Sequence, residues 1–183
     1  MKYAVILSLY LALSSTFLSG QVKYLGNEGV ISFYSHTAIE DIAAKNQQVS
    51  SVIDAESGEL AVIVKMTNFQ FEKKLMQEHF NENYVESEKF PKATFIGRVL
   101  NHSEVDYLKE GEYDVQVEGD LTIHGKTLKV TTEGSIEVNS GGIIARTKFL
   151  LNPEDYDIKI PKVVRRNIAE RLEITVELHC RPI

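Results

Sequence analysis

Residues Glu112–Val138 carry the pattern that most restricts the fold, because they form two long alternating segments joined at His124-Gly125. Apolar residues occupy odd positions before this dipeptide and even positions after it. A two-residue loop pairs Leu121 with Leu128 and brings both apolar sets to one face, whereas a loop of odd length would separate them. We therefore predict an antiparallel hairpin with one apolar face and one acidic or hydroxylic face, which suits the wall of a barrel.

Six further segments have strand-like alternation or are bounded by turn signals. They are Gly29–Thr37, Gln47–Asp54, Leu60–Thr67, Lys92–Leu100, Gly142–Leu151 and Arg171–Arg181. Together with the hairpin they make about eight mostly antiparallel strands, which predicts an all-β chain folded as a closed up-and-down barrel or a sandwich. Closure would remove the edges that long strands with an apolar face otherwise expose.

Three stretches break this alternation and predict short helical pieces. Glu72–Tyr84 places apolar residues at helical spacing, which predicts a short helix. Asn152–Ala169 contains two prolines and predicts a loop followed by a helical turn that begins near Pro161. Glu40–Lys45 is expected to form one further turn of helix.

Residues 1–20 have the features of a secretory signal peptide, with Lys2, the short apolar run Tyr3–Leu13 and a small polar stretch ending at Gly20. An uncleaved membrane anchor is the alternative, but the apolar run is short for a bilayer span. We expect cleavage and a periplasmic or secreted location. The remaining residues, 21–183, are expected to form one domain.

Charge and cysteine content narrow the possible functions. The chain has 20 basic and 26 acidic residues, and an acidic chain without a basic stripe is a poor nucleic-acid binder. Cys180 is the single cysteine, so no intramolecular disulfide can form. Its parity matches that of Leu172 and Leu178, which predicts a buried thiol. We expect no nucleic-acid partner, and the sequence leaves the oligomeric state open.

No catalytic or metal-binding motif emerges from the sequence. Gly125-Lys126-Thr127 resembles the end of a phosphate-binding loop, but its spacing and strand context predict a hairpin turn. The five histidines show no metal-ligand spacing. Glu78-His79 and the acidic cluster Glu154–Asp157 are the candidates for acid–base chemistry. We therefore expect a protein that is not an enzyme and that holds neither a metal nor a cofactor.

Basic residues concentrate late in the chain, at Lys159, Lys162, Arg165, Arg166 and Arg171. A solvated loop face is the simplest interpretation of such a run. The alternative is a receptor for an anionic head group or for an anionic membrane surface. In that alternative, Lys162, Arg165 and Arg166 are the candidate head-group contacts.

The apolar parity of the strands defines a candidate barrel lining that contains no charged side chain. Its members are Phe95, Val99, Tyr113, Val115, Val117, Leu121, Leu128, Val130, Ile136, Ile143, Phe149, Ile174, Val176 and Leu178. Gly97, Gly119 and Gly134 share these positions, and small wall residues leave volume unless neighbours fill it. An eight-stranded barrel either packs its own side chains or holds one small ligand. A ligand would be long and apolar, because a charged group inside would lack a partner.

Gly119–Thr127 (GDLTIHGKT) resembles the G-x-L-T-I-H-G-x-T signature of YceI-like proteins. Lys89–Phe95 (KFPKATF) is similar to the segment that begins a strand in that family, and Phe69–Phe71 and Asp155–Ile158 also fit the family order. The resemblance implies an extended, lipocalin-like, antiparallel eight-stranded barrel with one or two short helices. It also implies a periplasmic protein that binds polyisoprenoid or similar isoprenoid-tailed lipids.

On this resemblance the leading hypothesis is a carrier that holds an isoprenoid-tailed lipid, with a polyprenyl phosphate or quinone-like head, in an apolar tunnel. The helix in Glu72–Tyr84 would be its lid, with Met76, His79, Phe80 and Tyr84 as the candidate lid residues. Transient contact with a membrane surface would accompany loading. Two alternatives stay open: an envelope enzyme acting on an isoprenoid or quinone-like substrate, and a filled barrel that serves as a protein-interaction module.

Overall fold

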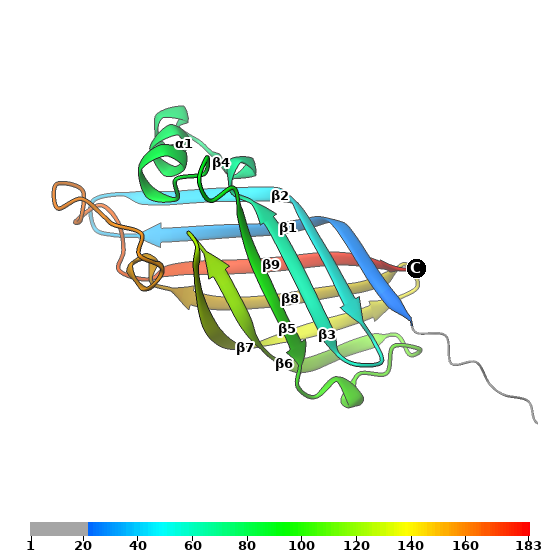
Figure 1. The fold of residues 1–183 in the computed structure, drawn as a ribbon. Coiled ribbons are helices and arrows are strands. Elements are labelled where there is room, and N and C mark those ends of the chain that lie inside the picture. The colour runs from blue at the N-terminus through cyan, green and yellow to red at the C-terminus, as the bar shows by residue number, and fades with distance from the viewer. Residues whose placement is uncertain (1–21) are drawn as a thin grey trace, which may run out of the picture.

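The computed structural model describes residues 22–183, so the expected signal peptide lies outside the described residues. Eight antiparallel strands close into a barrel because β1 pairs with both β2 and β9 (Figure 1). The strands are β1 (Lys23–His36), β2 (Asp41–Asp54), β3 (Glu59–Lys65), β5 (Lys92–Val99), β6 (Gly111–Ile123), β7 (Lys126–Asn139), β8 (Gly142–Leu151) and β9 (Leu172–Pro182). A ninth, two-residue strand, β4 (Gln70–Phe71), extends the sheet beside β2. The structure therefore confirms the closed barrel and not the sandwich.

The β6–β7 hairpin has the predicted register. Leu121 pairs with Leu128, Gly119 with Val130 and Val117 with Thr132. His124 and Gly125 form the turn, with φ values of 52° and 77°. Two consecutive residues with positive φ are typical of the turn that matches the twist of a two-residue hairpin. The glycine of the Gly-Lys-Thr sequence is therefore a turn residue, as predicted.

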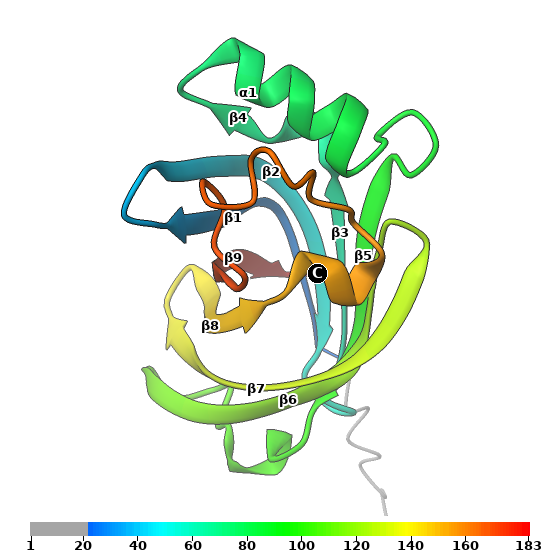
Figure 2. The ribbon, with the colours of Figure 1, turned by 90° about the vertical axis from the view of Figure 1, so that its left-hand side faces the viewer.

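The two ends of the barrel differ in how they are covered. One end, here called the packed end, carries the β2–β3, β5–β6 and β7–β8 connections and the start of β1. The other end, here called the mouth, carries the β1–β2 turn, the segment 66–91 and the β8–β9 loop 152–171. Figure 2 shows the barrel from the mouth, with α1 on one side and the β8–β9 loop crossing in front of the interior. Within residues 22–183, no helix has the length and apolar character that a membrane crossing requires.

Side chains fill the barrel at the packed end. Ile53, Ile136 and Ile143 are each only 1% exposed, and Tyr24 stacks on Tyr107 with ring centroids 5.6 Å apart. Burial raises the pKa of Tyr107 to about 12. Interdigitated packing of this kind leaves little free volume at this end of the barrel.

The thiol of Cys180 is buried, as its parity predicted. The residue is 2% exposed, and its Sγ lies 3.3 Å from the Ser51 hydroxyl. Burial raises the pKa of this thiol above its ordinary value, which favours the unreactive protonated form.

Gly97 and Gly119 face one another across β5 and β6 and bring the two strands close together. A Cβ built on Gly97 would lie 2.8 Å from the Gly119 Cα, and one built on Gly119 would lie 2.5 Å from the Phe95 ring. The Phe95 side chain therefore already covers the space beside both glycines. These glycines allow close approach of backbone and ring and do not add cavity volume.

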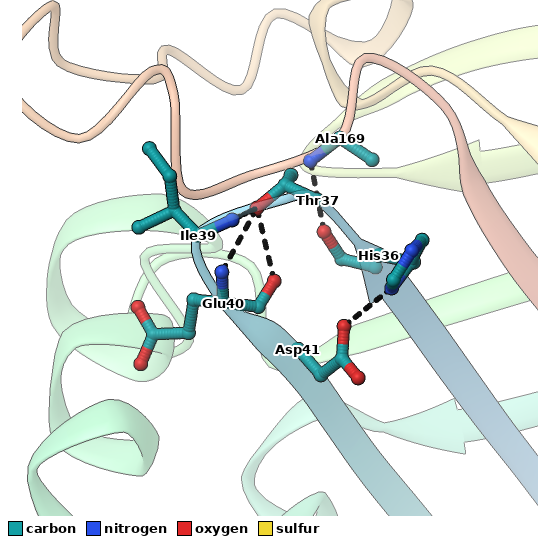
Figure 3. A network of polar contacts seen from close by, with 7 residues as sticks. His36, Thr37, Ile39, Glu40, Asp41 and Ala169 are labelled. Atoms are coloured by element: carbon teal, nitrogen blue, oxygen red, sulfur yellow. Dashed lines mark hydrogen bonds and ion pairs between the residues drawn. The ribbon is translucent and has the colours of Figure 1, made fainter.

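The prediction of a helical turn at Glu40–Lys45 is wrong. The chain makes a tight turn at residues 37–40 and then enters β2, where Asp41 pairs with His36 and Ala44 with Phe33. The Thr37 hydroxyl stabilises the turn by accepting hydrogen bonds from the amides of Ile39 and Glu40 (Figure 3). Cross-strand pairing along β1 therefore outweighs the local helical pattern.

The helix predicted within Glu72–Tyr84 is confirmed, whereas the β8–β9 loop is helical at its start and forms only turns after Pro161. α1 (Lys74–His79) continues into a π-helical turn, Phe80–Tyr84, so the chain is helical over most of the predicted stretch. The β8–β9 loop contains a 3₁₀ turn, Pro153–Tyr156, and then hydrogen-bonded turns that begin with the Val164 amide donating to the Pro161 carbonyl.

Candidate functional site

A cavity of about 370 Å³ occupies the barrel between the packed end and the mouth, and its wall is almost wholly apolar. Ile53, Val99 and Ile136 form part of its floor. At the mouth it is covered by side chains of α1, the π-helical turn and the β8–β9 loop. A cavity of this volume is within the usual range of about 300–1,000 Å³ for small-molecule sites. The barrel is thus filled at one end and hollow at the other.

Most of the predicted lining residues lie on the cavity wall. These are Phe95, Val99, Val115, Val117, Leu121, Val130, Ile136, Phe149, Ile174, Val176 and Leu178. Their contact with a ligand stays a prediction. The sequence did not single out the further wall residues Phe33, Phe69 and Phe71, which come from β1, the segment before β4, and β4 respectively.

Tyr113, Leu128 and Ile143 do not lie on the cavity wall, and their prediction as lining residues is wrong. Ile143 is buried among the packed-end side chains, and Tyr113 lies near the start of β6, where its hydroxyl donates to the Lys109 carbonyl at 3.0 Å. Leu128 lies near the hairpin turn and packs against the edge of the core. Parity gives the face that a side chain occupies but not its depth along the barrel.

Strands β7 and β8 diverge toward the mouth. They pair only from Gly134 with Thr147 to Asn139 with Gly142, although β7 pairs with β6 from Lys126 to Val138. The last contact at the split is between the hydroxyls of Thr132 and Thr147, which are 2.9 Å apart and both on the cavity wall. The wall beyond this point is completed by the β8–β9 loop, which supplies Pro153 and Ile158.

All four candidate lid residues, Met76, His79, Phe80 and Tyr84, lie on the cavity wall. Phe80 anchors the segment to the barrel, because its ring lies 5.7 Å from Phe33, 5.6 Å from Phe69 and 5.1 Å from Phe71. Aromatic contacts at these distances hold the helix over the mouth. That the segment moves as a lid stays a prediction.

Glu40 joins three segments at the mouth. Its two carboxylate oxygens accept hydrogen bonds from Lys73 at 3.2 Å and from Asn167 at 3.1 Å, which lie before α1 and in the β8–β9 loop. Beside it, the Ser35 hydroxyl accepts a hydrogen bond from the Ala169 amide at 2.8 Å (Figure 3). Glu40, Ser35 and Asn167 also lie on the cavity wall. Sequence reasoning missed this polar rim, because its members are distant in sequence.

The candidate head-group residues Lys162, Arg165 and Arg166 are exposed, and none of them lies on the cavity wall. Arg165 forms an ion pair with Glu154. The same loop turns Val164 and Ile168 toward the cavity. The loop therefore presents its apolar side chains to the interior and its cations to solvent. This arrangement agrees with the interpretation of the basic run as a solvated loop face. Head-group contact by these cations stays a prediction.

A second polar junction closes the opposite side of the mouth around His124. Its Nε2 lies 2.6 Å from the Glu86 carboxylate, and its Nδ1 lies 3.2 Å from the Tyr156 carbonyl. Both contacted atoms are oxygens that accept hydrogen bonds, and the imidazole lies between them. His124 thus ties the hairpin turn to the end of the lid and to the loop that covers the split between β7 and β8.

The same junction contains the non-glycine residues with positive φ among those described: Glu86 (43°), His124 (52°) and Asp157 (58°). The Asp157 carboxylate forms an ion pair with Lys126, with 3.0 Å between Oδ1 and Nζ. Left-handed backbone is costly for such residues and persists where the surroundings enforce it. The junction is therefore built by specific contacts, although in the sequence His124 appeared only as one of five scattered histidines.

The family model for the YceI-like domain matches residues 25–180. The chain belongs to the YceI-like family. This result confirms the family resemblance of the Gly119–Thr127 sequence, which forms the end of β6, the hairpin turn and the start of β7.

Solved structures support the same fold for this YceI-like barrel. A polyisoprenoid-binding domain from Saccharophagus degradans, implicated in plant cell wall breakdown, aligns with a TM-score of 0.77 at 14% identity, covering 89% of this chain and 99% of that domain. BcnA of Burkholderia cenocepacia aligns with a TM-score of 0.69 at 16% identity, covering 82% and 94%. The YCEI protein of Campylobacter jejuni gives a TM-score of 0.60 at 16% identity, covering 81% and 88%. A comparison with curated proteins found no match.

Candidate acid–base groups of the YceI-like barrel are poorly placed for chemistry on a buried substrate. Glu78 is exposed, and none of Glu154, Asp155 and Asp157 lies on the cavity wall. His79 reaches the cavity, and among residues 22–183 no group of three His, Cys, Asp or Glu side chains could hold a metal ion. Of these candidate groups, His79 alone therefore lies on the cavity wall.

We expect His124→Ala to lower the midpoint of thermal unfolding by about 4 °C, because it removes two hydrogen bonds, one of them to a charged group. Glu86→Gln is the matched control, since it keeps an acceptor for Nε2.

The hydrogen bond from His124 holds the pKa of Glu86 below its usual range, so this stabilisation is present at neutral pH and disappears as the pH falls through that lowered pKa. Calorimetry from pH 7 to acid should show the difference between wild type and Glu86→Gln narrowing. An unchanged midpoint in His124→Ala would contradict the junction.

Proposed function

We propose that this protein binds an isoprenoid-tailed lipid in the barrel cavity and carries it in the periplasm, without catalysis. The observation that carries the proposal is the apolar cavity of about 370 Å³ behind a helical cover. The solved domain from Saccharophagus degradans, which has the same fold, is described as polyisoprenoid-binding, and this supports an isoprenoid ligand here.

The physical basis of retention would be burial of the hydrocarbon tail. Removing apolar carbon from water contributes about 0.8 kcal/mol per CH₂, so about three to four isoprene units would give micromolar or tighter binding after ordering costs. The aromatic cluster around Phe80 and the apolar floor at Val99 and Ile136 offer contacts along such a tail.

The binding proposal is tested with purified mature protein and prenyl lipids of increasing tail length. We expect saturable one-to-one displacement of a fluorescent apolar probe, with affinity rising as isoprene units are added. Probe binding that prenyl lipids of every length fail to displace would contradict the proposal. Residues 1–20 would be removed on export, and the mass of the protein recovered from the periplasmic fraction tests that part directly.

Loading from a membrane would use the mouth, where exposed apolar side chains surround the cavity. Val163, Ile39 and Leu75 are 90%, 61% and 60% exposed, and each lies in a segment that Glu40 ties together. Lys162 and Arg166 lie beside Val163 in the loop and are exposed as well. Apolar tips flanked by cations suit the surface of an anionic bilayer.

We expect Val163→Asp to weaken binding to vesicles that contain phosphatidylglycerol roughly tenfold, because it replaces an inserting apolar side chain by an anion. Leu108→Asp is the control, since Leu108 is 96% exposed but lies in the β5–β6 loop at the packed end. Cosedimentation measures both variants. Equal losses in the two, or no loss in Val163→Asp, would contradict membrane loading through the mouth.

A further inference from the structure

The cavity wall contains few charged side chains, and their partners are already fixed. Among residues 22–183 the wall includes Glu40, His79 and Arg146 but no lysine. The guanidinium of Arg146 forms ion pairs with the carboxylates of Glu137, at 2.7 Å, and Glu177, at 3.0 Å. All three residues occupy strand positions whose side chains point to the outer face of the barrel. Among the described residues, no unengaged arginine or lysine therefore lines the cavity, where a phosphate would need one.

The charged group at the mouth side of the cavity wall is the carboxylate of Glu40, which is paired with Lys73. Glu40 accepts hydrogen bonds from Asn167 and Lys73, and these hold the pKa of its carboxyl below the usual range. The carboxylate is thus ionised at neutral pH. Lys73, the cation nearest to it, is committed to this ion pair. Within residues 22–183 the rim therefore offers a phosphate no arginine or lysine that is free of a carboxylate partner.

The same rim offers hydrogen bonds to an uncharged group. The Ser35 hydroxyl is 1% exposed and accepts from the Ala169 amide, and in the described part of the chain it donates to no other side chain. Its proton is available to a carbonyl or hydroxyl oxygen of a ligand. A ligand hydroxyl could in turn donate to the Glu40 carboxylate.

We propose that the rim formed by Ser35, Glu40 and Asn167 selects isoprenoid lipids with an uncharged hydroxyl or carbonyl head, a prenyl alcohol or a quinone, over prenyl phosphates and diphosphates. This inference rests on the proposed binding function and names the head-group class of that same site. The exposed cations Lys162 and Arg166 do not change it, because they lie outside the cavity wall on the solvent side of the loop.

The experiment compares ligands with one tail and different heads: geranylgeraniol, its monophosphate and its diphosphate. Competition against a fluorescent apolar probe gives the affinity of each for the purified protein. We expect the alcohol to bind at least tenfold more tightly than the diphosphate. Equal or tighter binding of the diphosphate would overturn the head-group inference while leaving isoprenoid binding intact, whereas failure of all three to bind would overturn the proposed function.

Two variants assign the selectivity to Glu40. Glu40→Gln removes the charge and keeps the shape, and we expect the preference for the alcohol to shrink to within threefold. Lys73→Gln removes the compensating cation, and we expect the preference to widen. The double variant Lys162→Gln/Arg166→Gln is the control and should leave the ratio unchanged. A ratio that stays constant in both Glu40→Gln and Lys73→Gln, or a selective loss of diphosphate binding in the control, would overturn the assignment.

Discussion

Val117→Arg is expected to reduce affinity for prenyl lipid at least roughly 100-fold while the barrel remains folded. Val117 lies on the cavity wall in β6, paired with Thr132 on one side and Val99 on the other. A guanidinium at this position occupies the space of the tail, and the carboxylate on the described part of the wall, that of Glu40, is already engaged by Lys73 and Asn167. The cavity has room for the longer side chain, so the damage to binding should exceed the damage to folding. Probe displacement and circular dichroism measure the two effects.

The matched control is Gln116→Arg, which places the same new side chain on the neighbouring, exposed position of the same strand. It should bind lipid as the wild type does. Val117→Trp is a second test that adds side-chain volume without charge, and we expect it to lower the affinity for long-tailed ligands. A folded Val117→Arg protein with normal lipid affinity would show that the tail does not occupy this cavity.

Gly97→Ala is expected to destabilise the barrel by about 3 kcal/mol, although it adds one methyl group. The backbone of Gly97 does not require positive φ, so the cause is steric. The new Cβ would lie 2.8 Å from the Gly119 Cα and also 2.8 Å from the Phe95 ring, and closer still to the Glu118 carbonyl oxygen. Backbone atoms of the paired strand cannot yield without breaking the β5–β6 register. Urea denaturation measures the loss.

Gly111→Ala is the control for this prediction. A Cβ at Gly111 would meet its nearest atoms, on the Tyr113 ring, at 3.6 Å, which is ordinary van der Waals contact. We expect its effect to stay within about 0.5 kcal/mol. Displacement of the Phe95 ring should also reduce lipid affinity in Gly97→Ala but not in Gly111→Ala. Similar stability of the two variants would mean that the Gly97–Gly119 approach is not a constraint on the fold.

Features governed by local periodicity were predictable from the sequence. The two-residue loop at His124-Gly125, with apolar residues at odd positions before it and at even positions after it, is sufficient to specify the pairing of Leu121 with Leu128. The same argument placed Cys180 inside. It fell short at the start of β1, where register shifts between Gly26 and Ile31 interrupt the alternation, so the strand begins at Lys23 and not at Gly29. Bulges of this kind remove the signal on which strand prediction depends.

The candidate site was predictable only in part. Parity identified most of the wall, but it gives no depth, so Ile143 at the packed end could not be separated from Val176 beside the cavity. The polar rim depends on Glu40 meeting Lys73 and Asn167 across long separations. No local pattern encodes such a meeting. His124 was likewise visible as a residue, but its role depends on Glu86 and Tyr156, which only the closed barrel brings beside it.

Native mass spectrometry of the mature protein, purified from the envelope of cells that express it and followed by organic extraction, tests lipid binding most directly. Lipid carriage in the cavity predicts a one-to-one adduct whose extracted mass corresponds to an isoprenoid lipid, and the head-group inference predicts that this lipid lacks phosphate. The adduct should be absent from Val117→Arg and present in Gln116→Arg. A bare protein mass that takes up no added prenyl lipid would contradict the carrier function.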